Sequence, residues 1–153
     1  MTKEVFAELV LKNEDILFKI AMSMLKNEAD AQDAMQSAIL KAFERLGTLK
    51  HEEYFRTWLV RILINICNKQ LRQRNRTIVW NGSGATSVSS EVEVEVRTAV
   101  EALPMKIRQV IIMYYSEQFT TKEISAILCI PKGTVLSRLH KGRKLLRLDL
   151  DEQ

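Results

Sequence analysis

Residues 120–146, TTKEISAILCIPKGTVLSRLHKGRKLL, carry the pattern that decides the C-terminal fold. Two amphipathic helical segments flank the short stretch CIPKG, where Pro131 cannot continue the first helix and can start the second. Thr120 or Thr121 is placed to cap the first helix, with Glu123 nearby. The pattern predicts a helix-turn-helix. The apolar residues expected to hold its two helices together are Ile124, Ile127, Leu128, Ile130, Val135 and Leu139.

The second helical segment is basic as well as amphipathic. No acidic residue lies between Lys132 and Arg147. In a helix-turn-helix the N-terminal half of the second helix enters the major groove, where basic and short polar side chains meet base edges and phosphates. Backbone N–H groups near Gly133 can also hold a phosphate. We therefore predict DNA binding by this segment. The residues suited to it are Lys132, Thr134, Ser137, Arg138, His140 and Lys141.

Composition and charge favour a helical protein with a nucleic-acid partner. The 153 residues include only 5 Gly and 2 Pro, which suits helix, and their number allows one medium domain or two small ones. The net charge of +4 is modest, but the basic residues are unevenly placed. A second basic helix is predicted over 55–76, where six basic residues and no acidic residue occur. The apolar residues of this segment, among them Leu59, Ile62 and Ile66, recur at helical spacing and are expected in the core. Trp58 could stack on a base, but its spacing with Phe55, Leu59 and Ile62 favours the core.

The rest of the chain predicts an all-α protein of two small helical domains. Helical periodicity covers Val5–Met24 and Ala29–Leu46, with Asn27 as an N-cap and Gly47 as a left-handed C-cap. The buried face of the second helix is expected to contain Met35, Ala38, Ile39, Ala42, Phe43 and Leu46. Two further helices, Val92–Ala102 and Met105–Tyr115, precede the helix-turn-helix. The composition becomes rich in Gly and Ser after Arg76, so the expected domains are 1–76 and 92–153, joined by a flexible linker over 77–91 that is either native or engineered.

Several classes of protein find no support in the sequence. Cys67 and Cys129 lie far apart among apolar residues, which predicts two buried, reduced thiols. No metal-ligand spacing, Gly-rich phosphate loop or nucleophile elbow occurs, so we expect no metal, no cofactor and no enzyme. The N-terminus does not resemble a signal peptide, and the longest apolar run, Val110–Tyr115, is too short to span a bilayer. We expect a cytoplasmic protein without membrane insertion.

Three stretches resemble the small two-domain class of bacterial sigma factors, the extracytoplasmic-function group of the sigma-70 family. Residues 102–146, ALPMKIRQVIIMYYSEQFTTKEISAILCIPKGTVLSRLHKGRKLL, resemble the family pattern that contains LP, EIA and GTV.SRL.RGR. Residues 29–46, ADAQDAMQSAILKAFERL, resemble DAEDAVQEVFLKAF, and residues 55–76, FRTWLVRILINICNKQLRQRNR, resemble F..WL..IA.N. The resemblance covers about Ile16–Arg76 and Val100–Arg147.

The resemblance implies a sigma factor that directs RNA polymerase core enzyme to promoter DNA and that an anti-sigma factor inhibits. Its implied polymerase-binding residues are Asp33, Gln36, Ser37, Leu40, Lys41 and Glu44. Its implied readers of the −10 element are the loop Leu49–Glu53, chiefly Leu49, Lys50 and His51, and the helical residues Ile62, Asn65, Lys69 and Arg72. Its implied −35 contacts are Lys132, Thr134, Leu136, Ser137, Arg138, His140, Lys141 and Arg143.

Two residues depart from the family pattern, and one other function is open. Ser37 stands where the family usually has Glu, and Leu136 stands where Arg or Lys is common. Leu136 could still contact a thymine methyl group. The alternative is a stand-alone helix-turn-helix regulator whose N-terminal half dimerises or senses a ligand. The basic helix over 55–76 argues against it, because a sensing domain does not need such a helix.

Overall fold

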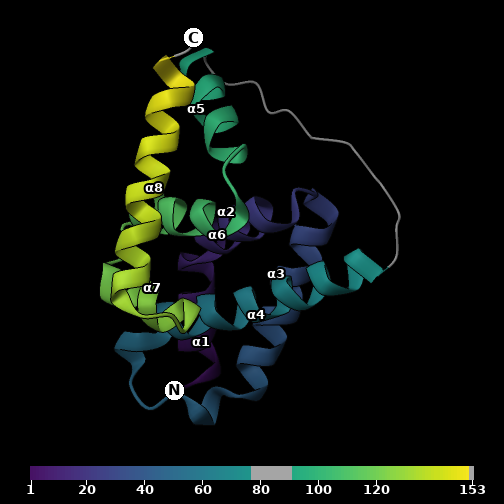
Figure 1. Ribbon diagram of the computed structural model, residues 1–153. Coiled ribbons are helices and arrows are strands. Elements are labelled where there is room, and N and C mark those ends of the chain that lie inside the picture. Colours follow the sequence, from purple (N-terminus) through teal and green to yellow (C-terminus); the bar gives the residue numbers. More distant parts are fainter. Residues whose placement is uncertain (77–90, 152–153) are drawn as a thin grey trace. The chain divides into compact units, whose positions relative to one another are not determined.

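The protein is helical throughout the part that the structure describes. The computed structural model describes residues 1–76 and 91–151, and every regular element in these two ranges is a helix (Figure 1). The chain divides into two compact units, unit 1 (Met1–Ala85) and unit 2 (Thr86–Gln153). The predicted all-α class is confirmed. Residues 77–90 of the predicted linker lie outside the described residues, and residue 91 begins a helix.

Unit 1 is built around the packing of three helices. Its elements are α1 (Lys3–Lys12), α2 (Glu14–Leu25), α3 (Glu28–Glu44), the short 3₁₀ turns η1 (Leu46–Thr48) and η2 (Glu52–Tyr54), and α4 (Phe55–Arg76). The helices α2, α3 and α4 all pack against one another. The helical periodicity predicted over Val5–Met24 is confirmed, and it is divided between two helices that meet at Asn13. The Asn13 Nδ2 donates to the Leu9 carbonyl at 2.7 Å, which ends α1.

Helix α3 turns its smallest side chains toward the core. Its buried residues are Ala31, Ala34, Ala38 and Ala42, each with no exposed surface. The predicted buried face is therefore right for Ala38 and Ala42 and wrong for Phe43, which is 43% exposed, while Met35, Ile39 and Leu46 are only half-buried. The physical reason is close approach, because an alanine stripe lets the backbone of α3 lie near α2 and α4. The larger side chains are left at the edge or outside.

The caps of these helices are partly as predicted. Asn27 caps α3 as expected, since its side chain accepts the Asp30 N–H at 2.9 Å. The left-handed cap predicted at Gly47 is wrong, because Gly47 lies within η1 and no glycine in the described residues has a positive φ. In unit 1 a residue with left-handed backbone occurs instead at Lys26, which follows the end of α2.

Unit 2 contains the predicted helix-turn-helix with two helices before it. Its elements are α5 (Glu91–Glu101), α6 (Met105–Ile111), the π turn η3 (Ile112–Ser116), α7 (Thr121–Leu128) and α8 (Lys132–Asp151). Helix α8 packs against α5, α6 and α7 (Figure 1). The helix predicted over Met105–Tyr115 changes to a π turn after Ile111, where Glu117 N–H donates to the Ile112 carbonyl, five residues back.

A buried arginine closes the turn between α5 and α6. Arg108 is 5% exposed, and its Nη1 donates to the carbonyls of Glu101 at 3.1 Å and Leu103 at 3.0 Å. These carbonyls lie at the end of α5, where helical backbone acceptors have no partner within the helix. Burial lowers the pKa of Arg108, and the nearby Glu101 opposes that shift. Arg108 thus fixes the end of α5 against α6.

Helix α8 lies very close to α6 at Gly142. A Cβ atom on this residue would lie 2.6 Å from Ile111 Cδ1 and 2.7 Å from Ile111 Cγ1. Ile111 is itself buried, so its side chain has little room to move. The absence of a side chain at Gly142 therefore allows α8 to approach α6. By contrast, a Cβ on Gly133, at the start of the same helix, would meet nothing within 4 Å.

We predict that Gly142→Ala destabilises the protein although alanine is the better helix former. The gain in helix propensity is about 1 kcal/mol, whereas forcing a methyl group into packed side chains costs about 1–3 kcal/mol. The free energy of unfolding should fall by up to about 2 kcal/mol in urea titrations followed by circular dichroism. The control is Gly133→Ala, which should leave stability unchanged or slightly raised. Equal stability of both variants would mean that α6 and α8 do not pack this closely.

The two thiols differ in their surroundings. Cys67 has no exposed surface, as predicted, and burial raises its pKa from the usual 9.0 to about 12. The prediction that Cys129 is buried is wrong, because this residue is exposed. It occupies a left-handed position, φ 56°, that ends α7 and faces outward between the two helices of the helix-turn-helix.

We predict that a thiol-alkylating reagent at neutral pH modifies Cys129 first and Cys67 only when unit 1 opens. The Cys67 rate should be slower by roughly two orders of magnitude or more, since it requires local unfolding. A Cys129→Ser variant should then show one slow thiol, and fast modification of it would contradict the burial of Cys67.

Between pH 9 and 12 the unfolded state loses the Cys67 proton that the folded state keeps. Stability should therefore fall as pH rises through this range and be unaffected by Cys67 below it.

Candidate nucleic-acid interface

The core of the helix-turn-helix forms as the sequence predicts. Ile124, Ile127, Val135 and Leu139 are buried between α7 and α8, while Leu128 and Ile130 are half-buried. A capping box starts α7: Thr120 Oγ1 accepts the Glu123 N–H at 3.1 Å, and a Glu123 carboxylate oxygen accepts the Thr120 N–H at 3.0 Å. The N-terminal end of α7 is therefore fixed by side-chain hydrogen bonds.

The turn between the helices is held by local hydrogen bonds. Ser125 Oγ donates to the Ile130 carbonyl at 2.5 Å, which ties the end of α7 to the residue before the proline. The Pro131 carbonyl accepts the N–H groups of Thr134 at 3.0 Å and Val135 at 3.2 Å. Helix α8 thus begins immediately after Pro131, whose ring ends the preceding segment.

The exposed side of α8 carries most of the residues predicted to bind DNA. Val135, Leu139 and Gly142 form its buried stripe. On the opposite side Leu136 is 50% exposed, and Ser137, His140 and Lys141 are exposed as well. The other predicted contacts flank this side: Lys132 and Arg143 are exposed, and Thr134 and Arg138 are half-buried. We call Leu136, Ser137, His140 and Lys141 the reading face.

Arg143 has partners that the sequence did not suggest. Its Nε donates to the Tyr115 hydroxyl, and its guanidinium carbon lies 5.6 Å from the Tyr115 ring centre and 5.8 Å from that of Tyr114. The two rings meet edge to face at 5.0 Å. Both tyrosines belong to the π turn η3, whereas Arg143 belongs to α8. This group therefore joins the segment before α7 to the second helix of the motif.

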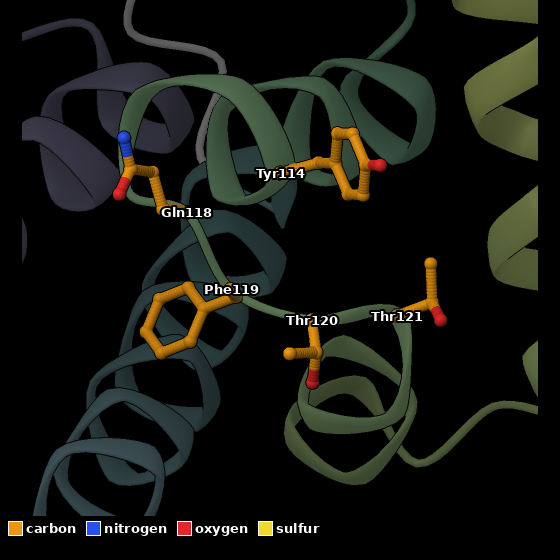
Figure 2. Close-up of a pocket in the computed structure, with 5 residues that line it drawn as sticks. All are labelled: Tyr114, Gln118, Phe119, Thr120 and Thr121. Carbon is orange, nitrogen blue, oxygen red and sulfur yellow. The ribbon is translucent and has the colours of Figure 1, made fainter.

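A shallow surface hollow lies between η3 and the start of α7. It is lined by Tyr114, Gln118, Phe119, Thr120 and Thr121 (Figure 2). Figure 2 shows Tyr114, on η3, and Thr121, at the first residue of α7, on the same side of this hollow. The hollow is open to solvent, and its lining includes Thr120 of the capping box.

Helix α4 has a polar, largely basic stripe on the side opposite its buried face. Arg61, Asn65, Lys69 and Arg72 are all exposed and recur every three or four residues, so they share one side of the helix. Leu59 and Leu63 have no exposed surface on the other side. We call Arg61, Asn65, Lys69 and Arg72 the α4 stripe. Arg61 was missed by the sequence analysis, although its spacing of four residues from Asn65 was the available signal.

One of the predicted −10 residues is not available for contact. Ile62 is 8% exposed and belongs to the core of unit 1, so its side chain cannot read a base in this conformation. Its spacing with Leu59 and Ile66 had already predicted an inward position, and that prediction is confirmed. Trp58 is half-buried, with its ring centre 5.8 Å from that of the buried Phe55.

The loop before α4 exposes polar and aromatic side chains. Lys50 and His51 are exposed, and Leu49 is half-buried. The His51 ring lies edge to face with Tyr54, 5.8 Å between centres, and Tyr54 is 57% exposed. Tyr54 is thus a second residue that the sequence analysis did not single out. An exposed aromatic ring beside a basic helix is suited to stacking on an unpaired base.

The outer side of α3 is polar with an apolar centre. Asp33, Gln36, Ser37 and Glu44 are exposed, Lys41 is half-buried, and Leu40 is 61% exposed. Phe43 adds a ring that is 43% exposed and packs edge to face on Phe6 of α1. This combination is expected of a protein-binding surface, because an exposed leucine beside an exposed phenylalanine is otherwise costly.

An arginine near the end of α4 fixes the position of that helix. Arg74 donates to the Leu25 carbonyl at 2.9 Å, at the end of α2, and forms an ion pair with Asp30 in the first turn of α3. This contact joins three helices at one corner of unit 1. Lys69 and Arg72 of the α4 stripe take no part in these contacts and are exposed.

Among the described residues, no three acidic, cysteine or histidine side chains lie together in a way that could hold a metal ion. Of the helices in the described ranges, none is long and apolar enough to cross a membrane.

Two sequence-family models match most of the chain. "Sigma-70 region 2" matches residues 9–77, and "Sigma-70, region 4" matches residues 93–146. The chain is 28% identical to the ECF RNA polymerase sigma factor SigW of Bacillus subtilis, over 97% of this chain and 90% of that protein. It is 26% identical to the RNA polymerase sigma factor SigV of the same organism, over 99% and 95% of the two chains.

Two solved structures share the fold. The sigma factor RpoE from Bartonella quintana, in complex with the anti-sigma factor NepR, matches with a TM-score of 0.86, 24% identity, and coverage of 97% of this chain and 98% of that one. CnrH, in complex with the cytosolic domain of CnrY, matches with a TM-score of 0.76, 23% identity, and coverage of 99% and 91%. The region 2 match lies in the helices of unit 1 and the region 4 match in those of unit 2, and the chain therefore belongs to the extracytoplasmic-function sigma factors of the sigma-70 family.

Proposed function

We propose that this sigma factor divides promoter recognition between its two units. Unit 1 binds RNA polymerase core enzyme and the −10 element, and unit 2 binds the −35 element. The observation that carries this division is the α4 stripe, an exposed basic surface in the unit that lacks the helix-turn-helix. A sigma factor is not an enzyme, and the residues named below bind and position partners.

The −35 element is assigned to α8. The reading face lies opposite the buried stripe, as a helix inserted in the major groove requires. Ser137, His140 and Lys141 have donors or acceptors for base edges, and Leu136 is exposed for contact with a thymine methyl group. Lys132 and the N–H groups at the start of α8 are placed for backbone phosphates. Thr134 and Arg138 flank the face and complete the proposed set.

The −10 element is assigned to the α4 stripe and the loop before it. Promoter opening exposes single-stranded bases, which proteins bind with basic side chains for the backbone and aromatic rings for the bases. Asn65 has amide donors and acceptors for a base edge, while Lys69 and Arg72 are suited to phosphates. Leu49, Lys50 and His51 belong to the loop that precedes α4, and Lys50 and His51 are exposed. Tyr54 supplies the exposed ring.

The polymerase-binding surface is assigned to the outer side of α3. Leu40 forms its apolar centre, and Phe43 extends it. The polar residues around this centre are Asp33, Gln36, Ser37, Lys41 and Glu44. The arrangement of an apolar centre within a polar rim is typical of protein–protein interfaces.

An anti-sigma factor is the proposed inhibitory partner. Of the two solved structures described above, the sigma factor RpoE is bound to the anti-sigma factor NepR, and CnrH is bound to the cytosolic domain of CnrY. Exposed apolar side chains on α3 are suitable for competition, because an inhibitor that covers Leu40 would exclude the polymerase. A stand-alone helix-turn-helix regulator is not favoured, since two sigma-70 regions match the chain.

We predict that Leu40→Asp weakens binding to core polymerase by roughly 10- to 100-fold, the usual effect of losing a central interface residue. A charged group would replace an apolar side chain at the centre of the proposed interface. The measurement is titration of labelled protein with core enzyme, with helical content checked by circular dichroism. The matched control is Leu11→Asp, since Leu11 is 65% exposed on α1 of the same unit. Similar affinities of both variants would remove α3 from the interface.

We predict that Asn65→Ala and Lys69→Ala each reduce promoter opening by about tenfold, the effect of losing one good polar contact to DNA. Opening is measured by permanganate reactivity of −10 thymines with the reconstituted holoenzyme. Binding of the same holoenzyme to a −35 duplex should change much less. Lys12→Ala, an exposed lysine on α1, serves as the charge control. Equal losses in both assays would contradict a separate −10 role for α4.

A further inference from the structure

The contact of Arg143 with two tyrosines separates this residue from the other basic residues of α8. Its guanidinium lies within 6 Å of both ring centres and donates to the Tyr115 hydroxyl. A guanidinium over aromatic faces is attracted by the negative charge of the rings, and the hydrogen bond adds direction. Three features of one side chain, its charge, its plane and its Nε, are thus already used within unit 2.

Arg143 lies at the edge of the reading face. Successive residues of an α-helix turn by about 100°, so Arg143, seven residues after Leu136, lies within about 20° of it around the helix, near the border between the buried stripe and the exposed side. His140 and Lys141 lie farther round the helix. Arg143 is also seven residues beyond Leu136, which is about 10 Å along the axis. It therefore stands at the edge of the surface that would enter the groove.

A directional contact at this border can control the rotation of α8 about its own axis. Gly142 has no side chain, so its contact with Ile111 brings α8 close to α6 but adds no directional bond. Val135 and Leu139 pack on one side but, as apolar side chains, supply no directional bond. A rotation of about 20° would move side chains at the helix surface by about 2 Å, given a helix radius of about 5–6 Å. Base contacts do not tolerate such a displacement.

We propose that Arg143 is a positioning residue, which fixes the rotation of α8 through Tyr114 and Tyr115 and does not contact the DNA backbone. The inference rests on the proposed −35 recognition by α8. Under it, the π turn η3 is a part of the reading apparatus although it carries no reading residue. The inference replaces the role expected for Arg143 as a −35 contact.

The test uses full-length protein bound to core polymerase and a library of duplexes with altered −35 elements, at several salt concentrations. The variants are Tyr115→Phe, which removes the hydrogen-bond acceptor and keeps the ring, Arg143→Lys, which keeps the charge, and their double mutant. Arg143→Gln removes the charge. Lys144→Gln removes one charge from the next position, which is exposed, and serves as the matched control.

Tyr115→Phe and Arg143→Lys should each lower the preference for the best −35 duplex by roughly three- to tenfold, the range of one ordinary hydrogen bond. The loss should extend over several base pairs, because the whole reading face turns. The double mutant should be no worse than either single mutant, since both break the same contact. Lys141→Ala, on the reading face, should instead relax one or two base pairs. The slope of log affinity against log salt should be the same for Arg143→Gln as for the wild type.

A phosphate contact by Arg143 would give the opposite pattern. Arg143→Gln would then flatten the salt slope by about 0.9, keep every base preference, and leave Tyr115→Phe like the wild type. Wild-type preferences in every variant would equally overturn the inference. If Arg143→Gln does not fold, Tyr115→Phe and the double mutant still decide. A wild-type protein that shows no −35 preference at all would overturn the proposed function and not the role of Arg143 alone.

Discussion

Small side chains at helix contacts are the constraint on which both units depend. In unit 1 the alanine stripe of α3 faces α2 and α4, and in unit 2 Gly142 of α8 faces α6. At each contact the absence of side-chain volume sets how near the helices come and which way the remaining residues point. The larger side chains of the same helices are then displaced to the border or the outside. The exposed functional faces follow from this arrangement.

The exposed outer side of α3 and the reading face of α8 therefore have a common physical origin. Since α3 buries alanines, Leu40 and Phe43 are left exposed and are available to a partner. Because α8 turns Val135, Leu139 and Gly142 toward its neighbours, its polar residues Ser137, His140 and Lys141 lie on the opposite side. In each unit, an arginine side chain also binds the carboxyl end of a helix. Arg74 joins the end of α2 to α3 and α4, and Arg108 holds the end of α5.

The helices and the helix-turn-helix could be predicted from the sequence, but the rotation of α3 could not. Periodicity locates helices and their apolar residues, and local cap chemistry identified Asn27 and Thr120 correctly. The prediction for α3 was right for Ala38 and Ala42 and wrong for Phe43, because hydrophobicity ranks Phe43 above Ala42, whereas close packing requires the reverse. The helix break at Asn13 and the exposure of Cys129 depend on single backbone conformations, which periodicity does not contain.

The surfaces show the same limit of sequence reasoning. The basic character of α4 was visible in its composition, yet Ile62 was assigned both to the core and to a base contact, and only burial separates these roles. Arg143 belonged to a run of basic residues that are equivalent in sequence, and the contact that distinguishes it comes from tyrosines 28 residues earlier in the chain. Charge in a sequence therefore identifies which helix meets an anion. The partner of each individual cation is decided by tertiary packing, so a basic residue within a DNA-binding helix can serve the fold and not the DNA.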